Sequence, residues 1–312
     1  MRTFYTASII NLSSVLFTLD MENSQRLETS DNLIKECILD LYINPKKSMV
    51  KWSKITNQTA QGKFAYPSQH LASLITGIKG KGSAARGDDL ADGSEIKSCS
   101  RADQLRSCNN CGANVLLWQK ECPNCGSTDI KVDTSSHWIF PIRSDDELDL
   151  LLNRVPRIIF ILFDKEDSES ENIRIRAWTV NPQESYVKAF FTDYYVNNFK
   201  MKTDKGEKPA PCNLHPLKYD FFMMRPKLIF HADIIENDVE IEFWDLKHPK
   251  EQPMFSHLLS KEQLIQIFGK KVSVLKKTQI VEKFPYIPQK DFDKLVMKKK
   301  VLKKYKQKYV RR

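Results

Sequence analysis

The spacing of apolar residues along the chain predicts five helices. Residues 31–42 place apolar side chains at helical intervals, and residues 67–77 begin with Pro and Ser and end in Gly. Residues 144–153 open with an acidic turn, residues 184–200 are rich in aromatic side chains, and residues 260–268 start with a Ser cap. Each of these patterns is typical of a helix.

A different pattern, of alternating or uninterrupted apolar residues, predicts the strands. Residues 158–163 contain no polar side chain, which indicates a strand covered on both faces. Residues 173–180 alternate between apolar and polar side chains, so we expect a half-exposed strand there. Residues 137–142 form a further predicted strand, and residues 227–246 hold two more around a turn at 236–238.

The turn-forming pair Asp92-Gly93 predicts a hairpin between two short strands. Helices, hairpin and strands in this order predict an α/β fold with a mixed sheet flanked by helices. Apolar residues make up 41% of the 312-residue chain and charged residues 28%, which is globular composition and excludes a disordered or fibrous protein. This length allows one large domain or two modest ones.

The first candidate for chemistry is an acidic and lysine-containing motif around the Asp92-Gly93 turn. Glu95 and Lys97 are two residues apart, so on a strand their side chains share one face. A hairpin would bring the carboxylate of Asp89 within reach of Glu95. Two carboxylates can hold Mg²⁺, and a neighbouring lysine can stabilise charge on a phosphate. The same spacing also arises on any charged hairpin as an ordinary ion pair.

The second candidate is a cysteine segment at residues 106–133. Cys108, Cys111, Cys122 and Cys125 form two C-x-x-C pairs ten residues apart, and each pair is followed by glycine. Four thiolates at this spacing are typical of a closed, structural Zn²⁺ site. The seven cysteines are an odd number, which does not suit a disulfide framework. The alternatives are a redox pair or free thiols. The remaining cysteines, Cys37, Cys99 and Cys212, are interpreted as structural.

Both motifs together resemble a known enzyme family. The text ARGDDLADGSEIKSCSRADQ, the cysteine segment after it and the helix SQHLASLITG before it are similar to the PD-(D/E)XK nucleases. Within that superfamily the text is most similar to the MamI-type restriction endonucleases, over about residues 60–145. The resemblance implies a sheet flanked by helices with the zinc ribbon inserted, magnesium dependence and a dimer acting on DNA.

The resemblance also assigns roles to residues. It implies that Asp89 and Glu95 are metal ligands and that Lys97 is the catalytic lysine. One departure concerns the first acid, because no proline precedes it and Asp88 stands in that place. Asp88 and Asp92 therefore remain rival ligands.

The excess positive charge points to a polyanionic partner. The formal net charge is +10, and residues 294–312 contain ten Lys and Arg and no acid. The rest of the chain holds 39 basic and 39 acidic residues. This basic C-terminal arm is predicted to grip DNA phosphates, although a solvated helix has the same composition. The candidate DNA contacts in the arm are Lys298, Lys299, Lys300, Lys303 and Lys304.

Several polar residues near the motif allow two interpretations. Ser100, Arg101, Asp103 and Gln104 either face the scissile phosphate or cap a helix, and phosphate contact is favoured for Arg101. Gln69 and His70 lie on the helix before the motif, where some nucleases place a side chain that supports the metal; ordinary solvent-facing positions are the preferred interpretation. The scattered histidines are interpreted as structural: His137, His215, His231 and His248.

The predicted organisation is an uncertain N-terminal extension at 1–20, an endonuclease domain at 21–293 and the arm at 294–312. The apolar stretch near the N-terminus is interrupted by polar residues and is too short to span a bilayer. Together with the cysteine pattern, this favours a cytoplasmic protein without a membrane partner.

The sequence therefore predicts a type II restriction endonuclease that cuts double-stranded DNA. The resemblance implies a homodimer and a palindromic target, either continuous or interrupted. A cognate DNA methyltransferase is expected as a separate protein. Two alternatives remain: a PD-(D/E)XK repair or mobile-element nuclease without a fixed site, and a non-enzymatic zinc-ribbon protein that binds nucleic acid.

Overall fold

A computed structural model describes residues 25–82, 89–133, 135–165, 172–218, 220–221 and 224–247. Three sequence predictions lie outside these residues: the N-terminal extension at 1–20, the helix at 260–268 and the basic arm at 294–312. No helix within the described residues is both long enough and apolar enough to cross a membrane.

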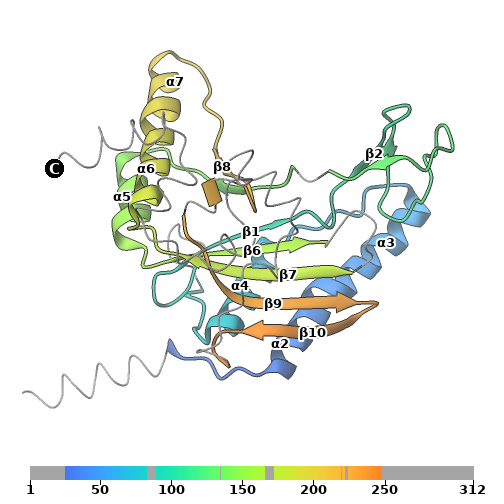
Figure 1. Ribbon diagram of the computed structural model, residues 1–312, viewed down its shortest axis with the longest axis horizontal. Helices are drawn as coiled ribbons and strands as arrows, with labels where there is room; N and C mark the ends of the chain where they lie inside the picture. Colours follow the sequence, from blue (N-terminus) through green and yellow to red (C-terminus); the bar gives the residue numbers. More distant parts are fainter. Residues whose placement is uncertain are drawn as a thin grey trace, which may run out of the picture.

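A five-stranded mixed sheet forms the centre of the fold, in the order β1-β6-β7-β9-β10 (Figure 1). Strand β1 pairs with β6 in parallel, and the other neighbours are antiparallel. The predicted mixed sheet is therefore confirmed. The strands are β1 (Glu95–Ser100), β6 (Ile158–Asp164), β7 (Ile173–Val180), β9 (Lys227–Ile235) and β10 (Asp238–Trp244).

Helices cover one face of this sheet and start and end where the sequence places signals. Helix α2 (Asp31–Ile38) begins at Ser30, whose hydroxyl accepts a hydrogen bond from the backbone N–H of Leu33, and it continues as a π-helical segment at Leu39–Ile43. Helix α3 (Asn44–Thr56) follows, and α4 (Ala65–Thr76) ends at Gly77 with φ of 66°. The apolar sides of α2 and α4 pack on residues of β1, β6, β7 and β9.

The opposite face is covered by a second layer. It consists of the strand pair β5 (Trp138–Phe140) and β8 (Cys212–Leu214), helix α5 (Asp145–Asp149) and helix α6 (Ser185–Tyr194), while the short α7 (Met201–Asp204) extends from the end of the α6 segment and buries no residue. Helix α5 continues as a π-helical segment at Leu150–Arg154, and α6 continues as one at Tyr195–Lys200. Every residue of β6 is buried because both faces of the sheet are covered, which confirms the predicted central strand.

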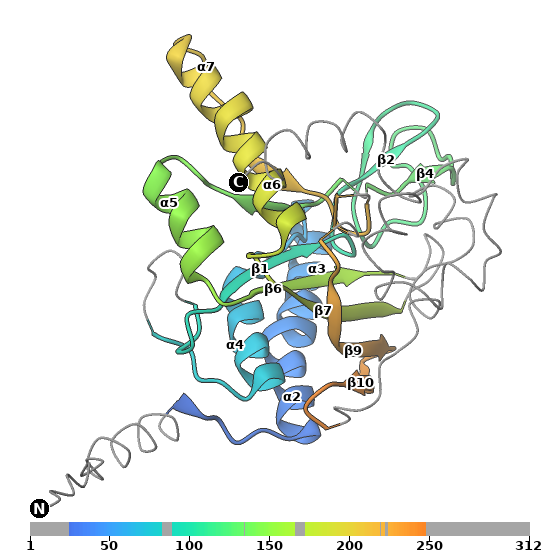
Figure 2. The same cartoon turned by 60° about the vertical axis from the view of Figure 1, so that its left-hand side comes forward.

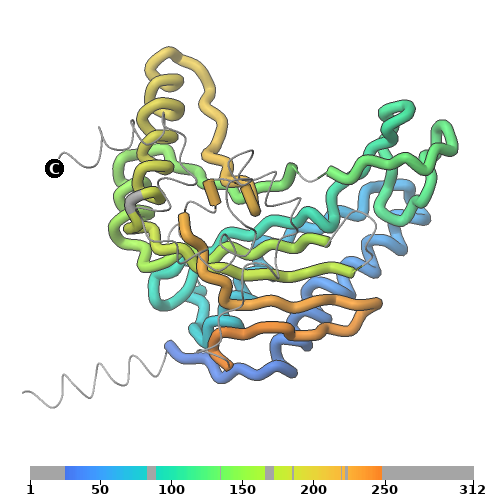
Figure 3. Tube along the Cα trace, in the orientation of Figure 1, coloured from blue at the N-terminus to red at the C-terminus, as the bar shows by residue number. Residues whose placement is uncertain are grey.

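A small three-stranded sheet is inserted between β1 and β5, as the cysteine segment predicts. It consists of β2 (Arg106–Cys108), β3 (Asn114–Val115) and β4 (Ile130–Lys131), in the order β3-β2-β4. The tube in Figure 3 shows this sheet and the α6–α7 segment at opposite ends of the molecule, and Figure 2 shows both projecting from the same side of the main sheet.

Residues 173–180 form a strand as predicted, but the prediction that one of its faces is exposed is wrong. Strand β7 is buried on both faces, including Arg174 and the fully inaccessible Arg176. The alternating pattern arises because these two guanidinium groups face inward and share one counter-charge. Asp164 accepts from Arg176 at 2.5 Å and lies 3.5 Å from Arg174. Alternation of charged and apolar residues therefore marks a buried ion cluster here.

The predicted hairpin is also only partly present. Strand β1 follows the turn, and Gly93 adopts φ of 83° as a tight turn requires. The residues before the turn form no second strand; Leu90 makes an isolated bridge to Gly80 instead. Strand β1 is thus an edge strand of the main sheet within the described residues.

The buried cluster generates a stability prediction. We expect Asp164→Ala to lower the free energy of unfolding by about 3–5 kcal/mol, because it leaves Arg176 charged and fully buried without its carboxylate. The measurement is urea denaturation. The control is Asp149→Ala, which breaks an ion pair with Arg154 at the surface; the two side chains are 45% and 68% exposed, so the free energy of unfolding is expected to change little. Equal losses in the two variants would contradict this account of β7.

Candidate functional site

The start of β1 places the predicted carboxylate and lysine on one face. Glu95 and Lys97 are opposite Ile158 and Phe160 of the parallel strand β6 and form an ion pair with each other. Glu95 is 9% exposed, and Lys97 lies above the Phe140 ring at 5.4 Å from its centre. The pair is therefore held against the sheet and shielded from most of the solvent.

Asp89 reaches the same strand from the loop before the turn. Its Oδ2 accepts a hydrogen bond of 2.7 Å from the backbone N–H of Ile96, which lies between Glu95 and Lys97. The Oδ1 accepts a bond of 2.6 Å from the side-chain amide of Gln69 on α4. The structure thus brings Asp89 and the Glu95–Lys97 pair together, although Asp89 does not lie on a strand.

Gln69 is a residue whose role the sequence interpretation missed. It is half-buried and bonded to Asp89, so its assignment to an ordinary solvent-facing position is wrong. Its neighbour His70 is exposed, as expected. The signal in the sequence was position alone: Gln69 stands on the helix directly before the acidic motif.

The electrostatics of Asp89 suit a group that exchanges a proton for a cation. Burial raises the pKa of Asp89 and the charge of Glu95 adds to this rise, whereas the hydrogen bond from Ile96, the charge of Lys97 and the hydrogen bond from Gln69 oppose it. The ionised carboxylate is therefore less favourable here than in the unfolded chain. A bound cation would relieve that cost.

Of the rival acids, Asp92 is engaged elsewhere. Its carboxylate pairs with Arg157 at 2.9 Å and accepts from the Ser94 backbone N–H at 3.0 Å, which closes the turn. Asp88 lies outside the described residues. Among the described acids, Asp89 is the one that contacts the backbone of the motif strand.

A small pocket opens beside the motif. Glu95 and Lys97 line it together with Glu147, whose carboxylate accepts from the Arg143 backbone N–H at 2.6 Å. Its remaining walls are apolar and come from β5 and the α5 segment, including Phe140 and Leu151. Low polarity around the pair strengthens its electrostatic interactions with a charged ligand.

The polar residues after β1 divide between two structural roles. Asp103 is buried and accepts from Tyr42 at 3.0 Å and Ser100 at 2.8 Å, and it pairs with Lys46 at 2.7 Å. Arg101 donates to the carbonyl of Pro216 at 2.9 Å, and burial lowers its pKa. These contacts connect the end of β1 to the helices on one face and to the β8 region on the other.

The four cysteines of the inserted sheet converge on one point. Their sulfur atoms all lie within 4.8 Å of one another, with Cys108 and Cys125 at 3.6 Å and Cys111 and Cys122 at 3.5 Å. Zn–S bonds of about 2.3 Å place two ligands of a tetrahedron about 3.8 Å apart, so this geometry fits a metal with four sulfur ligands. A disulfide would need about 2.05 Å.

The loops around the cysteines have the expected conformation. Gly112 and Gly126 adopt φ of 74° and 71°, which lets each loop fold back around its sulfur atoms. Hydrogen bonds from the Ala113 backbone and the Asn124 side chain lower the pKa of Cys111 to about 6, whereas burial raises that of Cys122 to about 11. One thiolate therefore forms easily, and another has to lose its proton when metal binds.

No other described residues form such a cluster. Apart from the four cysteines, the described part of the chain contains no group of three or more His, Cys, Asp or Glu with ligand atoms that close together. His137 packs edge-on against His215, and His231 lies 3.3 Å from Asp233, while His248 is outside the described residues. Burial raises the pKa of Cys99 to about 12, consistent with an inert thiol.

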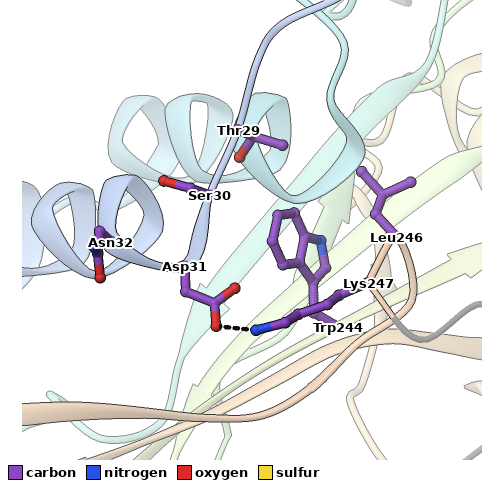
Figure 4. A pocket seen from close by; sticks show the side chains of 7 residues that line it. All are labelled: Thr29, Ser30, Asp31, Asn32, Trp244, Leu246 and Lys247. Carbon is purple, nitrogen blue, oxygen red and sulfur yellow. Dashed lines mark hydrogen bonds and ion pairs between the residues drawn. The ribbon is translucent and has the colours of Figure 1, made fainter.

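A second groove lies far along the fold from the motif, between the start of α2 and the end of β10 (Figure 4). Asp31 and Lys247 form a 2.6 Å ion pair across it, and the ring of Trp244 lies beside them, bonded to the Ile75 carbonyl at 2.8 Å. Its charged groups neutralise each other and its indole is already paired, so this groove carries no chemistry comparable to that at β1.

Comparison with known proteins gives the class of the chain. Residues 51–262 match the family described as MamI restriction endonuclease, a range that contains the acidic–lysine motif and all four clustered cysteines. This chain therefore belongs to the MamI restriction endonuclease family.

Among curated proteins the chain is similar to the type II restriction enzyme MamI of Microbacterium ammoniaphilum. The two are 32% identical over 154 residues, which cover 49% of this chain and 44% of that enzyme. The aligned region thus spans less than half of the relative's length. No solved structure matches the chain significantly.

The Gln69 contact generates a titration prediction. We expect Gln69→Leu to raise the pKa of Asp89 further, because a hydrogen-bond donor stabilises the ionised carboxylate and its loss favours the protonated form. Carbon-13 NMR of the aspartate side-chain carboxyls, followed against pH, measures this shift. His70→Leu on the same helix is the control and is expected to leave the pKa unchanged. An unchanged or lower Asp89 pKa in Gln69→Leu would contradict this role of the amide.

Proposed function

We propose that this protein is a magnesium-dependent, site-specific endonuclease that cuts both strands of DNA and that its fold is a PD-(D/E)XK nuclease core. The observation that carries the proposal is the position of Asp89. Its carboxylate is bonded to the backbone between Glu95 and Lys97, in a chain of a restriction endonuclease family. Two acids and a lysine thus meet at the start of one strand.

The donor set fits a hard divalent cation. Asp89 and Glu95 would supply carboxylate oxygens, the ligands Mg²⁺ prefers, and the raised pKa of Asp89 leaves a carboxylate that gains from a cation. When bound, Mg²⁺ polarises the phosphodiester and lowers the pKa of a coordinated water. Lys97 would orient the attacking water or stabilise negative charge on the phosphate. Its ion pair with Glu95 keeps the ammonium beside the acids.

The connection after β1 supports the nuclease core. The chain leaves β1, passes through the cysteine sheet, β5 and α5, and returns as the parallel strand β6. Glu95 and Lys97, on the first part of this strand, line the pocket that opens beside β5 and the α5 segment. The scissile phosphodiester would enter through that pocket.

The cysteine cluster is proposed to bind structural Zn²⁺. Four protein ligands close the coordination sphere, so no position remains for substrate, and the ion would stabilise a segment whose own buried apolar residues are few. The finer assignments are also proposals. They are a homodimer, a palindromic target that is either continuous or interrupted, a separate methyltransferase, phosphate contact by Arg101 and by the arm lysines from Lys298 to Lys304, and the domain bounds 21–293.

The direct test of the activity is digestion of a plasmid with Mg²⁺, followed by sequencing of the fragment ends. A site-specific enzyme leaves ends that share one sequence. A nuclease without a fixed site leaves unrelated ends, and a binding protein leaves the plasmid intact.

The lysine generates a catalytic prediction. We expect Lys97→Ala to slow plasmid cleavage by at least about 10²-fold, because a donor beside the developing charge is lost. Binding of the target DNA in Ca²⁺, measured by gel shift, is expected to persist. Lys205→Ala, at an exposed lysine outside the pocket, is the control. Cleavage by Lys97→Ala at the wild-type rate would remove Lys97 from the mechanism.

The cysteines generate a metal prediction. The purified protein is expected to contain one zinc ion per chain by elemental analysis. Cys111→Ser should lose the ion and lower the thermal unfolding temperature, because metal binding and folding of the segment are coupled. Cys37→Ser, which changes a cysteine outside the cluster, should keep it. Full stability of metal-free wild-type protein would contradict the zinc assignment.

A further inference from the structure

Helix α3 contacts the other described residues of the chain along only a narrow strip. Ser53 is its only buried residue, although the helix is 13 residues long. Trp52 is 57% exposed, Ile55 is 65% exposed and Met49 is 40% exposed. Helices of this length are marginal without packing, so a large apolar side chain left in solvent indicates a surface that another molecule covers.

The same side of α3 is strongly basic. Lys47, Lys51 and Lys54 recur at helical intervals of four and three, so they form a row beside Trp52 and Ile55. All three are exposed, and none forms an ion pair with a described residue. Residues 41–87 contain eight Lys and Arg and no acid. Outside the C-terminal arm the positive and negative charges are therefore equal in number, but residues 41–87 are locally basic.

The cysteine segment, residues 106–133, contacts this helix through Trp118. The indole N–H of Trp118 donates to the hydroxyl of Ser53 at 3.1 Å, and that hydroxyl donates to the Gln58 carbonyl at 2.5 Å. The inserted sheet thus lies against the buried strip of α3 and leaves the lysine row uncovered. Figure 1 shows α3 running toward the sheet that contains β2.

We propose that the α3 face, defined by Lys47, Lys51, Lys54, Trp52 and Ile55, binds the backbone of double-stranded DNA. This inference rests on the proposed function, which supplies DNA as the partner. The lysine row on α3 identifies the surface that would bind it. The lysines would neutralise phosphates, and the indole and Ile55 would pack against the sugars. A second copy of this chain is disfavoured as the occupant, because a twofold interface would set three lysines against three lysines.

The test compares salt dependence of DNA binding. The triple variant Lys47→Gln/Lys51→Gln/Lys54→Gln should flatten the slope of log affinity against log salt by about 2–3 units, from ~0.9 per lost phosphate contact. Binding is measured by fluorescence anisotropy on a labelled duplex in Ca²⁺, with the full chain. Lys47→Arg/Lys51→Arg/Lys54→Arg keeps the charges and should retain the slope. Lys35→Gln/Lys227→Gln removes two charges from α2 and β9 and should also retain it.

The outcomes separate this proposal from the proposed function. An unchanged slope in the triple Gln variant, with wild-type protein that still cuts DNA, would overturn the α3 face alone. Wild-type protein that neither binds nor cuts DNA would overturn the proposed function instead. A change in oligomer mass in Trp52→Ala/Ile55→Ala by analytical ultracentrifugation, without any change in slope for the Gln variant, would assign the face to a second copy and reject DNA as its occupant.

Discussion

The hydrogen bond from Ile96 to Asp89 connects the fold with its candidate chemistry. Strand β1 is at the edge of the described sheet, and an edge strand presents backbone N–H groups that need acceptors. Asp89 satisfies one of them, and Gln69 of α4 holds the other carboxylate oxygen. The same bond that completes the strand therefore positions a carboxylate beside Glu95 and Lys97. A shift of the β1–β6 register by one residue would turn Glu95 and Lys97 together to the other face of the sheet, away from the pocket that they line.

Features determined by local pattern could be predicted from the sequence. The uninterrupted apolar run became the fully buried strand β6, and the Pro-Ser start with a Gly end became α4. The two C-x-x-C-Gly repeats specify their own loop geometry, so the four cysteines could be grouped into one candidate metal site before their positions were known. Glu95 and Lys97 share a face because side chains alternate along any strand.

Features that depend on partners distant in sequence could not be predicted. The alternating apolar and charged residues of β7 are typical of a strand with one face in solvent. In the structure the β5–β8 layer covers that face, and Asp164 neutralises the two arginines. Gln69 is twenty residues from Asp89, and no local rule connects them. The basic face of α3 could not be recognised from net charge, because acids elsewhere balance its lysines in the total for residues 1–293.

Asp103 extends the connection from β1 to α3. Its carboxylate, buried at the end of the segment that follows β1, binds Tyr42 just before α3 and Lys46 in its first turn. Trp118 of the cysteine segment donates a hydrogen bond to Ser53 in the later part of the same helix. Helix α3 is thus attached at one end to the strand that carries Glu95 and Lys97, and farther along to the segment that the metal would order. These contacts hold α3 against the segment that follows β1, while Glu95 and Lys97 line the pocket on the β5 and α5 side of the same strand. Loss of metal from the cysteine segment would therefore weaken the contact of Trp118 with α3 without altering the carboxylates of Asp89 and Glu95.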